Sequence, residues 1–179
     1  MLMERARSLL IVFVTLGFLA SCIDPPQYPN EPEISNIKLS RTLVDQQDTF
    51  HIIFDFTDGD GDLGFEDVDF GFCALCDTMV DTSCYNIPEL SILITNLSTH
   101  CLVSAYQVPY IPPKGSSSSI SGEITVRVFD CCVYPDLTSC YSNSNYPTDT
   151  VQYEVRIKDR AGNVSNRLVT EPLLFNCNN

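Results

Sequence analysis

Residues 151–158 alternate strictly between apolar and polar side chains, and this alternation limits the possible folds more than any other feature of the chain. Four apolar residues share one face of the segment: Val151, Tyr153, Val155 and Ile157. The positions between them are polar. Successive side chains of a β-strand point to opposite faces of a sheet, so a period of two predicts a strand with one buried and one solvated face.

Similar patterns recur in residues 34–40, 50–56, 68–72, 90–95, 124–130 and 168–175. No segment after residue 33 has the period of an amphipathic helix, and the Ser-rich residues 112–119 are expected to form a loop. Repeated short strands with one wet face are typical of antiparallel sheets. We therefore predict an all-β domain over residues 33–179, an antiparallel β-sandwich of about seven strands.

The first 32 residues predict a targeting segment followed by a spacer. Arg5 and Arg7 precede an uncharged run over 9–20, which is shorter than the roughly 20 residues of a membrane span. Residues 19–22, Leu-Ala-Ser-Cys, resemble a bacterial lipobox, which implies cleavage before Cys22 and lipid on its thiol. We expect a signal peptide over 1–21 and a lipidated cysteine with a proline-rich stalk over 22–32. An ordinary secretory signal is the alternative.

Residues 153–165 resemble the closing hairpin of bacterial immunoglobulin-like and fibronectin-III-like domains. The matching positions are Asp159, Ala161, Gly162, Asn163 and Ser165. With the lipobox and the stalk, the chain resembles small Bacteroidetes-type lipoproteins. The resemblance implies an immunoglobulin-like sandwich on an outer-membrane lipoprotein of the cell envelope, facing the periplasm or the exterior. It implies little about function, because this fold serves many roles.

Eight cysteines remain besides Cys22, and we predict that they form disulfides: Cys73, Cys76, Cys84, Cys101, Cys131, Cys132, Cys140 and Cys177. An exported chain enters an oxidising compartment, where an even number of cysteines favours a disulfide framework. Cys76 and Cys84 have the same spacing as Cys132 and Cys140, which suggests two similar stapled loops. A thiol–disulfide oxidoreductase motif or a zinc site is less favoured, because neither a helical setting nor a second well-spaced pair is present.

Residues 58–64 contain three aspartates that alternate with glycine: Asp58, Asp60 and Asp62. Such a segment allows the carboxylates to converge, and hard oxygen ligands favour Ca²⁺. Asp69 follows along the chain, and Asp159 and Asn163 would add ligands if the closing hairpin lies beside this turn. The spacing resembles the start of an EF-hand loop, but the flanking segments are expected to be strands. The alternative is a solvated acidic turn without a metal.

The motifs of several large enzyme classes are absent from the sequence. There is no nucleophile elbow, no zinc-protease motif and no phosphate-binding loop. We therefore predict that the chain is not an enzyme. The net charge of −13 would repel phosphate backbones, and on this basis we exclude nucleic acid as a partner.

These observations predict a lipid-anchored cell-envelope binding or scaffolding module, with Ca²⁺ as a candidate stabilising ion. Its expected partners are the membrane, through the N-terminal lipid, and an envelope protein or glycan. An alternative is a carbohydrate-binding accessory lipoprotein of a glycan-uptake system, in which tyrosines stack on sugars: Tyr85, Tyr106, Tyr110, Tyr141 and Tyr146. A secreted hydrolase is a third and less favoured hypothesis.

Overall fold

The computed structural model describes residues 27–45, 48–65, 92–98, 102–112, 118–130 and 148–177. These ranges contain ten β-strands in three sheets and no helix. No helix suited to crossing a membrane occurs in the ranges described. The prediction of an all-β architecture is thus confirmed for the described residues, most strand pairs are antiparallel as predicted, and the arrangement is consistent with a β-sandwich.

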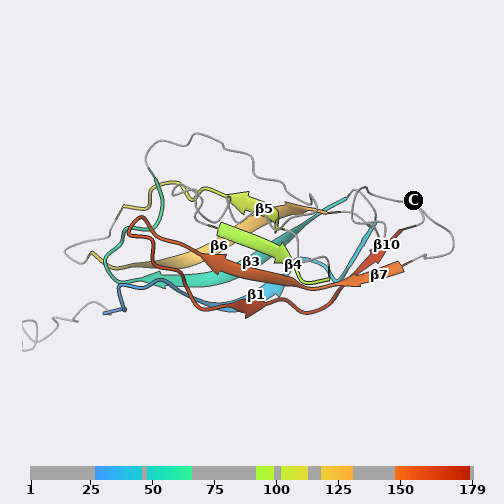
Figure 1. Ribbon diagram of the computed structural model, residues 1–179, viewed down its shortest axis with the longest axis horizontal. Coiled ribbons are helices and arrows are strands. Elements are labelled where there is room, and N and C mark those ends of the chain that lie inside the picture. The colour runs from blue at the N-terminus through green and yellow to red at the C-terminus, as the bar shows by residue number, and fades with distance from the viewer. Residues whose placement is uncertain are drawn as a thin grey trace, which may run out of the picture.

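The first sheet has the order β1-β3-β6 and contains β1 (Glu33–Leu39), β3 (Thr49–Asp58) and β6 (Ile120–Phe129). The second has the order β5-β4-β8-β9, with β5 (Leu102–Tyr106), β4 (Ile92–Asn96), β8 (Tyr153–Ile157) and β9 (Leu168–Val169). The third has the order β2-β10-β7, with β2 (Leu43–Asp45), β10 (Leu173–Asn176) and β7 (Thr148–Val151). Figure 1 shows β7 and β10 at the C-terminal end of the molecule, away from the end of β3.

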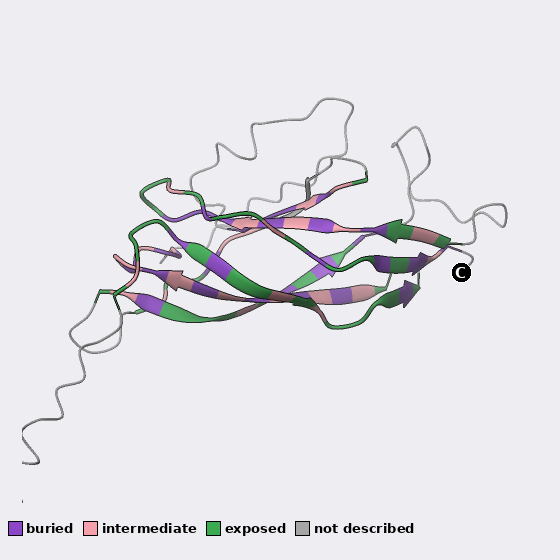
Figure 2. Cartoon of the chain, turned by 90° about the horizontal axis from the view of Figure 1, so that it is seen from below, coloured by how far each residue is buried: buried purple, intermediate pink, exposed green. Residues whose placement is uncertain are grey.

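The core is formed by the alternating apolar faces of the strands. The predicted inward residues of β3 are all buried: Phe50, Ile52, Phe54 and Phe56. They join one cluster with residues of the second sheet, among them Ile94 and Val155. Figure 2 shows the alternation of buried and less buried positions along the strands. Each fully buried large apolar side chain contributes about 1.5–3 kcal/mol, so the strict alternation accounts for much of the driving force.

The predicted strand over 151–158 is two strands in two different sheets, which corrects the sequence interpretation. Val151 ends β7 and pairs with β10, whereas Tyr153 begins β8 and pairs with β4. Between them, the Gln152 carbonyl accepts a hydrogen bond from the Leu97 N–H at 2.9 Å. The Gln152 side chain donates to the Thr170 carbonyl at 3.0 Å. The chain therefore changes sheets at Gln152 without interrupting the alternation of burial.

The predicted strand over 168–175 is also divided, into β9 and β10. The break contains Pro172, which has no N–H to donate to a ladder. β10 pairs parallel with β2, so the third sheet is mixed and not purely antiparallel. These divisions, together with the short strands β2 and β5, explain why the described residues contain more than the expected seven strands. Residues 68–72, predicted as a strand, lie outside the described residues.

A polar cluster is buried where β8 begins. The Tyr153 hydroxyl donates to Asp130 Oδ2 at 2.8 Å, and the Asn96 side chain donates to the same oxygen at 3.1 Å. Tyr153 is fully buried and Asp130 is 7% exposed. Burial raises the pKa of the Tyr153 hydroxyl far above its usual value, and the charge of Asp130 raises it further. The tyrosine therefore keeps its proton and supports a buried carboxylate.

Tyr153→Phe is expected to lower the free energy of unfolding by about 1.5–3 kcal/mol at pH 7, because it removes a buried hydrogen bond to a charged group. The folded-state pKa of Tyr153 lies above its unfolded value. Its contribution is therefore complete below about pH 10 and is lost as the pH rises beyond it. Urea unfolding at pH 7 and above pH 10 measures both effects. Tyr110→Phe, at an exposed tyrosine, is the control. Equal losses in the two variants would contradict the prediction.

Cys177 is fully buried in the core. Cys22 lies outside the described residues. So do the other predicted disulfide cysteines, which are Cys73, Cys76, Cys84, Cys101, Cys131, Cys132 and Cys140. The pairing and the two stapled loops therefore stay predictions. Of the predicted stalk, residues 27–32 are described, and they do not stand apart from the domain. The Pro29 carbonyl accepts a hydrogen bond from the Gly59 N–H at 2.8 Å, and Pro32 is buried.

Candidate metal site at the acidic turn

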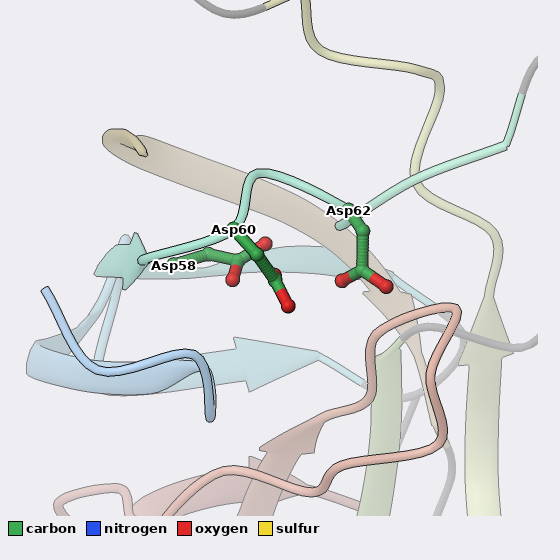
Figure 3. Close-up of side chains that lie close together, drawn as sticks. All are labelled: Asp58, Asp60 and Asp62. Carbon is green, nitrogen blue, oxygen red and sulfur yellow. The ribbon is translucent and has the colours of Figure 1, made fainter. Parts of the chain in front are cut away.

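The three aspartates of residues 58–64, here called the acidic turn, converge as the sequence predicts. Asp58 is the last residue of β3, and Asp60 and Asp62 follow in the turn. One carboxylate oxygen from each of the three lies within 4.8 Å of the others. Figure 3 shows the three side chains on the same side of the turn. The geometry therefore brings three candidate ligand atoms to one point.

Each of the three aspartates has one buried oxygen that accepts no hydrogen bond. The Oδ1 atoms of Asp58, Asp60 and Asp62 are all inaccessible to solvent and lack a hydrogen-bond partner. Asp58 as a residue is fully buried, and its Oδ2 atom accepts the Leu63 N–H at 2.9 Å. A buried acceptor without a partner costs free energy, and an ionised one costs more. A cation bound by the three converging carboxylates would compensate this cost.

The electrostatics of the turn agree with this geometry. Burial raises the pKa of Asp58 to about 6; the Leu63 N–H lowers it, and the neighbouring Asp60 and Asp62 raise it. Burial also raises the pKa of Asp62, as do the charges of Asp159 and Asp60. In the metal-free turn, desolvation and mutual repulsion therefore destabilise the ionised form of these carboxylates.

The glycines of the turn pack so closely against the backbone of other segments that a side chain would not fit. A Cβ atom on Gly59 would lie 2.3 Å from the Tyr28 carbonyl oxygen, and one on Gly61 would lie 2.0 Å from that of Ser118. A Cβ on Gly64 would lie 2.4 Å from the Pro109 carbonyl oxygen. Gly61 and Gly64 also have positive φ, at 70° and 93°. Their absence of a side chain is thus what lets the turn fit among three remote segments.

The loop that follows β8, residues 158–164, lies beside the acidic turn and is here called the closing loop. Asp62 Oδ2 accepts the Ala161 N–H at 3.0 Å, and the Asp62 carbonyl accepts the Arg160 N–H at 3.4 Å. The closing loop therefore lies next to the acidic turn, which is the condition under which Asp159 and Asn163 would add ligands.

Asp159 and Asn163, both predicted as ligands, bind each other. Asp159 Oδ1 accepts the Asn163 N–H at 2.8 Å, and Asp159 Oδ2 accepts the Asn163 side-chain amide at 2.8 Å. Among the described residues, the converging group consists of Asp58, Asp60 and Asp62 without Asp159. Asp159 instead stabilises the closing loop and adds negative charge near Asp62. Asp69, the remaining predicted ligand, lies outside the described residues.

Arg160 contacts the acidic turn, which the sequence did not predict. Its guanidinium donates to the Gly64 carbonyl at 3.0 Å and lies over the Tyr110 ring, 5.6 Å from the ring centroid. It thereby connects the closing loop to the end of the acidic turn and to the segment after β5. The sequence offers no signal for this role beyond the position of Arg160 directly after Asp159.

The comparisons with known proteins identify no family. No family model matches the chain, and no curated protein matches it. A solved structure that matches is Pseudomonas fluorescens alkylpurine DNA glycosylase AlkC bound to DNA containing an abasic site analog. The match has 6% sequence identity and a TM-score of 0.35, and it covers 83% of this chain and 31% of that chain. This chain thus spans about a third of the glycosylase.

Two expectations from the sequence disagree with this comparison and are corrected. The sequence predicted an envelope binding or scaffolding module and excluded nucleic acid, whereas the matching structure is an enzyme in complex with DNA. The exclusion rested on net charge, which is a sum over the chain and does not describe any one surface. Neither expectation is carried further. A TM-score of 0.35 is too low to transfer fold or function, so no DNA-repair role is assigned either.

Proposed function

We propose that this β domain binds Ca²⁺ at the acidic turn and that the ion braces one end of the fold. The observation that carries the proposal is the convergence of the Asp58, Asp60 and Asp62 carboxylates, each of which has one buried oxygen without a hydrogen-bond partner. A cation among them would compensate the desolvation and the repulsion that raise the pKa of Asp58 and Asp62.

The spacing of the oxygens suits Ca²⁺. Ligands on a Ca²⁺ ion lie about 2.3–2.6 Å from it, so opposite ligands are separated by up to about 5 Å. The three oxygens lie within 4.8 Å of one another, which fits inside that sphere. Mg²⁺ binds at about 2.0–2.1 Å, demands near-octahedral geometry and usually keeps several waters, so a site built from protein carboxylates favours Ca²⁺. Hard oxygen donors without sulfur or nitrogen disfavour softer metals.

The ion would act through the segments that the acidic turn contacts. Asp58 anchors the site to the end of β3, and Asp62 holds the closing loop through Ala161. Gly59 holds the N-terminal segment through Pro29. Figure 1 shows the end of β3, the closing loop and the start of the described chain at the same end of the molecule. A bound cation would therefore tie together backbone from three parts of the sequence.

Calorimetric titration of the purified, oxidised, chelator-stripped protein tests the proposal. We expect one Ca²⁺ site with a dissociation constant in the range of about 10⁻⁶–10⁻³ M, the range of sensor and extracellular sites. Mg²⁺ is expected to bind more weakly, and Asp60→Asn is expected to abolish the Ca²⁺ signal. A solvated turn without a metal would give no heat with either ion and a melting temperature that chelator does not change.

We further propose the immunoglobulin-like form of the sandwich, braced by disulfides. The hydrogen bond between Asp159 and Asn163 in the closing loop and the buried Tyr153 support the immunoglobulin-like form, and the full burial of Cys177 in the core supports the bracing. Peptide mapping of the unreduced protein would test the bracing. Free thiols at most of the cysteines would contradict it.

A further inference from the structure

The first residues that the structure describes, 27–31, lie against the acidic turn and are here called the entry segment. The Pro29 carbonyl accepts the Gly59 N–H at 2.8 Å. The Tyr28 carbonyl oxygen comes so close to Gly59 that a Cβ there would lie 2.3 Å from it. Tyr28 is half-buried, whereas the rest of the entry segment is exposed. The contact between the entry segment and the turn is therefore small, and one backbone hydrogen bond adds little net stability to it.

From Pro32 onward, the chain is held by contacts that do not involve the acidic turn. Pro32 and Ile34 are buried, and β1 pairs with β3 from Glu33. The Asn166 side chain accepts the Ile34 N–H at 2.8 Å and donates to the Ile34 carbonyl at 2.9 Å. The entry segment can therefore detach from the turn while β1 stays in its sheet, and Pro32 is the residue at which it would hinge.

Gly59, which holds the entry segment, lies between two of the candidate ligands, Asp58 and Asp60 (Figure 3). Its N–H belongs to the peptide bond that follows Asp58, and its carbonyl accepts the Ser118 hydroxyl at 3.2 Å. Because glycine has wide freedom in φ and ψ, the direction of this N–H depends on how the two neighbouring residues are held. In the metal-free turn the charge of Asp60 repels that of Asp58. A cation bound to both carboxylates would replace this repulsion by attraction and would fix the backbone on either side of Gly59.

We propose that Ca²⁺ at the acidic turn docks the entry segment onto the domain, and that loss of the ion releases this segment as far as Pro32. The proposal rests on the calcium site proposed above. Docking and ion binding favour each other, so the ion shifts a weakly held segment from the released to the docked state. The ion thereby sets the direction in which the chain before residue 27 leaves the domain.

Acrylamide quenching of a single tryptophan tests the proposal. The chain contains no Trp, so Tyr28→Trp places a unique fluorophore in the entry segment and keeps the backbone carbonyls that contact Gly59. In saturating Ca²⁺, the quenching constant of this variant is expected to be about twofold or more lower than in chelator, because docking shields the ring. Phe129→Trp is the matched control. Phe129 is 53% exposed and pairs with Thr49, at the far end of β3 from Asp58, so its quenching should not respond to Ca²⁺.

Calorimetric Ca²⁺ titration of the Tyr28→Trp protein separates the two proposals. Ca²⁺ binding with unchanged quenching would overturn the docking alone, whereas no Ca²⁺ binding would overturn the proposed function itself. Adding Asp60→Asn to Tyr28→Trp should abolish both the heat and the change in quenching. A change in quenching that persists in this double variant, or an equal change in the Phe129→Trp control, would show that the response does not come from the acidic turn and would also overturn the docking.

Discussion

Asp58→Asn is expected to stabilise the metal-free protein and to abolish the stabilisation that Ca²⁺ gives to the wild-type chain. Asn keeps an oxygen that accepts the Leu63 N–H, and its amide can donate toward the unpartnered oxygens of Asp60 and Asp62. The substitution removes the carboxylate whose desolvation raises the pKa of Asp58 to about 6. Since one pKa unit corresponds to about 1.4 kcal/mol, the metal-free variant should gain on the order of 2 kcal/mol at pH 7.

Ca²⁺ should stabilise the wild-type protein but not the variant. An ion at about 100 times its dissociation constant stabilises the folded state by about 2.7 kcal/mol. Chemical unfolding of both proteins, in chelator and in Ca²⁺, measures the four free energies. The two stability orders should cross: the variant is more stable without the ion, and the wild type gains selectively with it.

Asp45→Asn is the matched control for this experiment. Asp45 is exposed on β2, and its Oδ1 atom accepts the Asn176 side-chain amide at 2.8 Å, which Asn can also accept. The substitution changes the net charge by the same amount far from the acidic turn, so the Ca²⁺ increment should stay at its wild-type size. Equal Ca²⁺ increments in Asp58→Asn and wild type would contradict the calcium site, as would a loss of stability in the metal-free variant.

Gly61→Ala is expected to lower the free energy of unfolding by about 3–5 kcal/mol, or to prevent folding, because two penalties act together. The backbone at Gly61 has a φ of 70°, which a residue with a Cβ adopts at a cost. The added Cβ would also lie 2.0 Å from the Ser118 carbonyl oxygen, so one of the two segments must move. Urea unfolding in chelator measures the loss without any contribution from a bound ion.

Gly162→Ala separates the two penalties. Gly162 has a φ of 91°, but no heavy atom lies within 4 Å of the position that its Cβ would take. It should therefore show the conformational cost alone, about 1–2 kcal/mol. If the two variants lose the same stability, the close approach of the Ser118 backbone to the acidic turn is wrong.

The parts of the fold that the sequence predicted correctly are those in which burial alone decides the pattern. β3 and β8 alternate because one face of each is buried, and this needs no knowledge of the partner strand. The change of sheet at Gln152 was missed for the same reason. Val151 and Tyr153 are both buried, but against different sheets, so the alternation continues through the break.

The candidate site was predictable to a similar extent. The convergence of Asp58, Asp60 and Asp62 follows from local spacing, and the structure brings them together. Asp159 and Asn163 bind each other and do not join the converging carboxylates, and their spacing in the sequence does not decide between these two arrangements. The role of the glycines depends on Tyr28, Pro109 and Ser118, which are remote in sequence.

The acidic turn is assembled from segments near residues 28, 64, 109, 118 and 160. Contacts between such distant parts of a chain form only after long loops have closed, which places them late on the folding route. The three carboxylates are therefore in position only when the assembly is nearly complete. A cation held there would stabilise the native state more than the transition state, and so it would slow unfolding while hardly changing the rate of folding. Its benefit would be a longer lifetime of the folded chain.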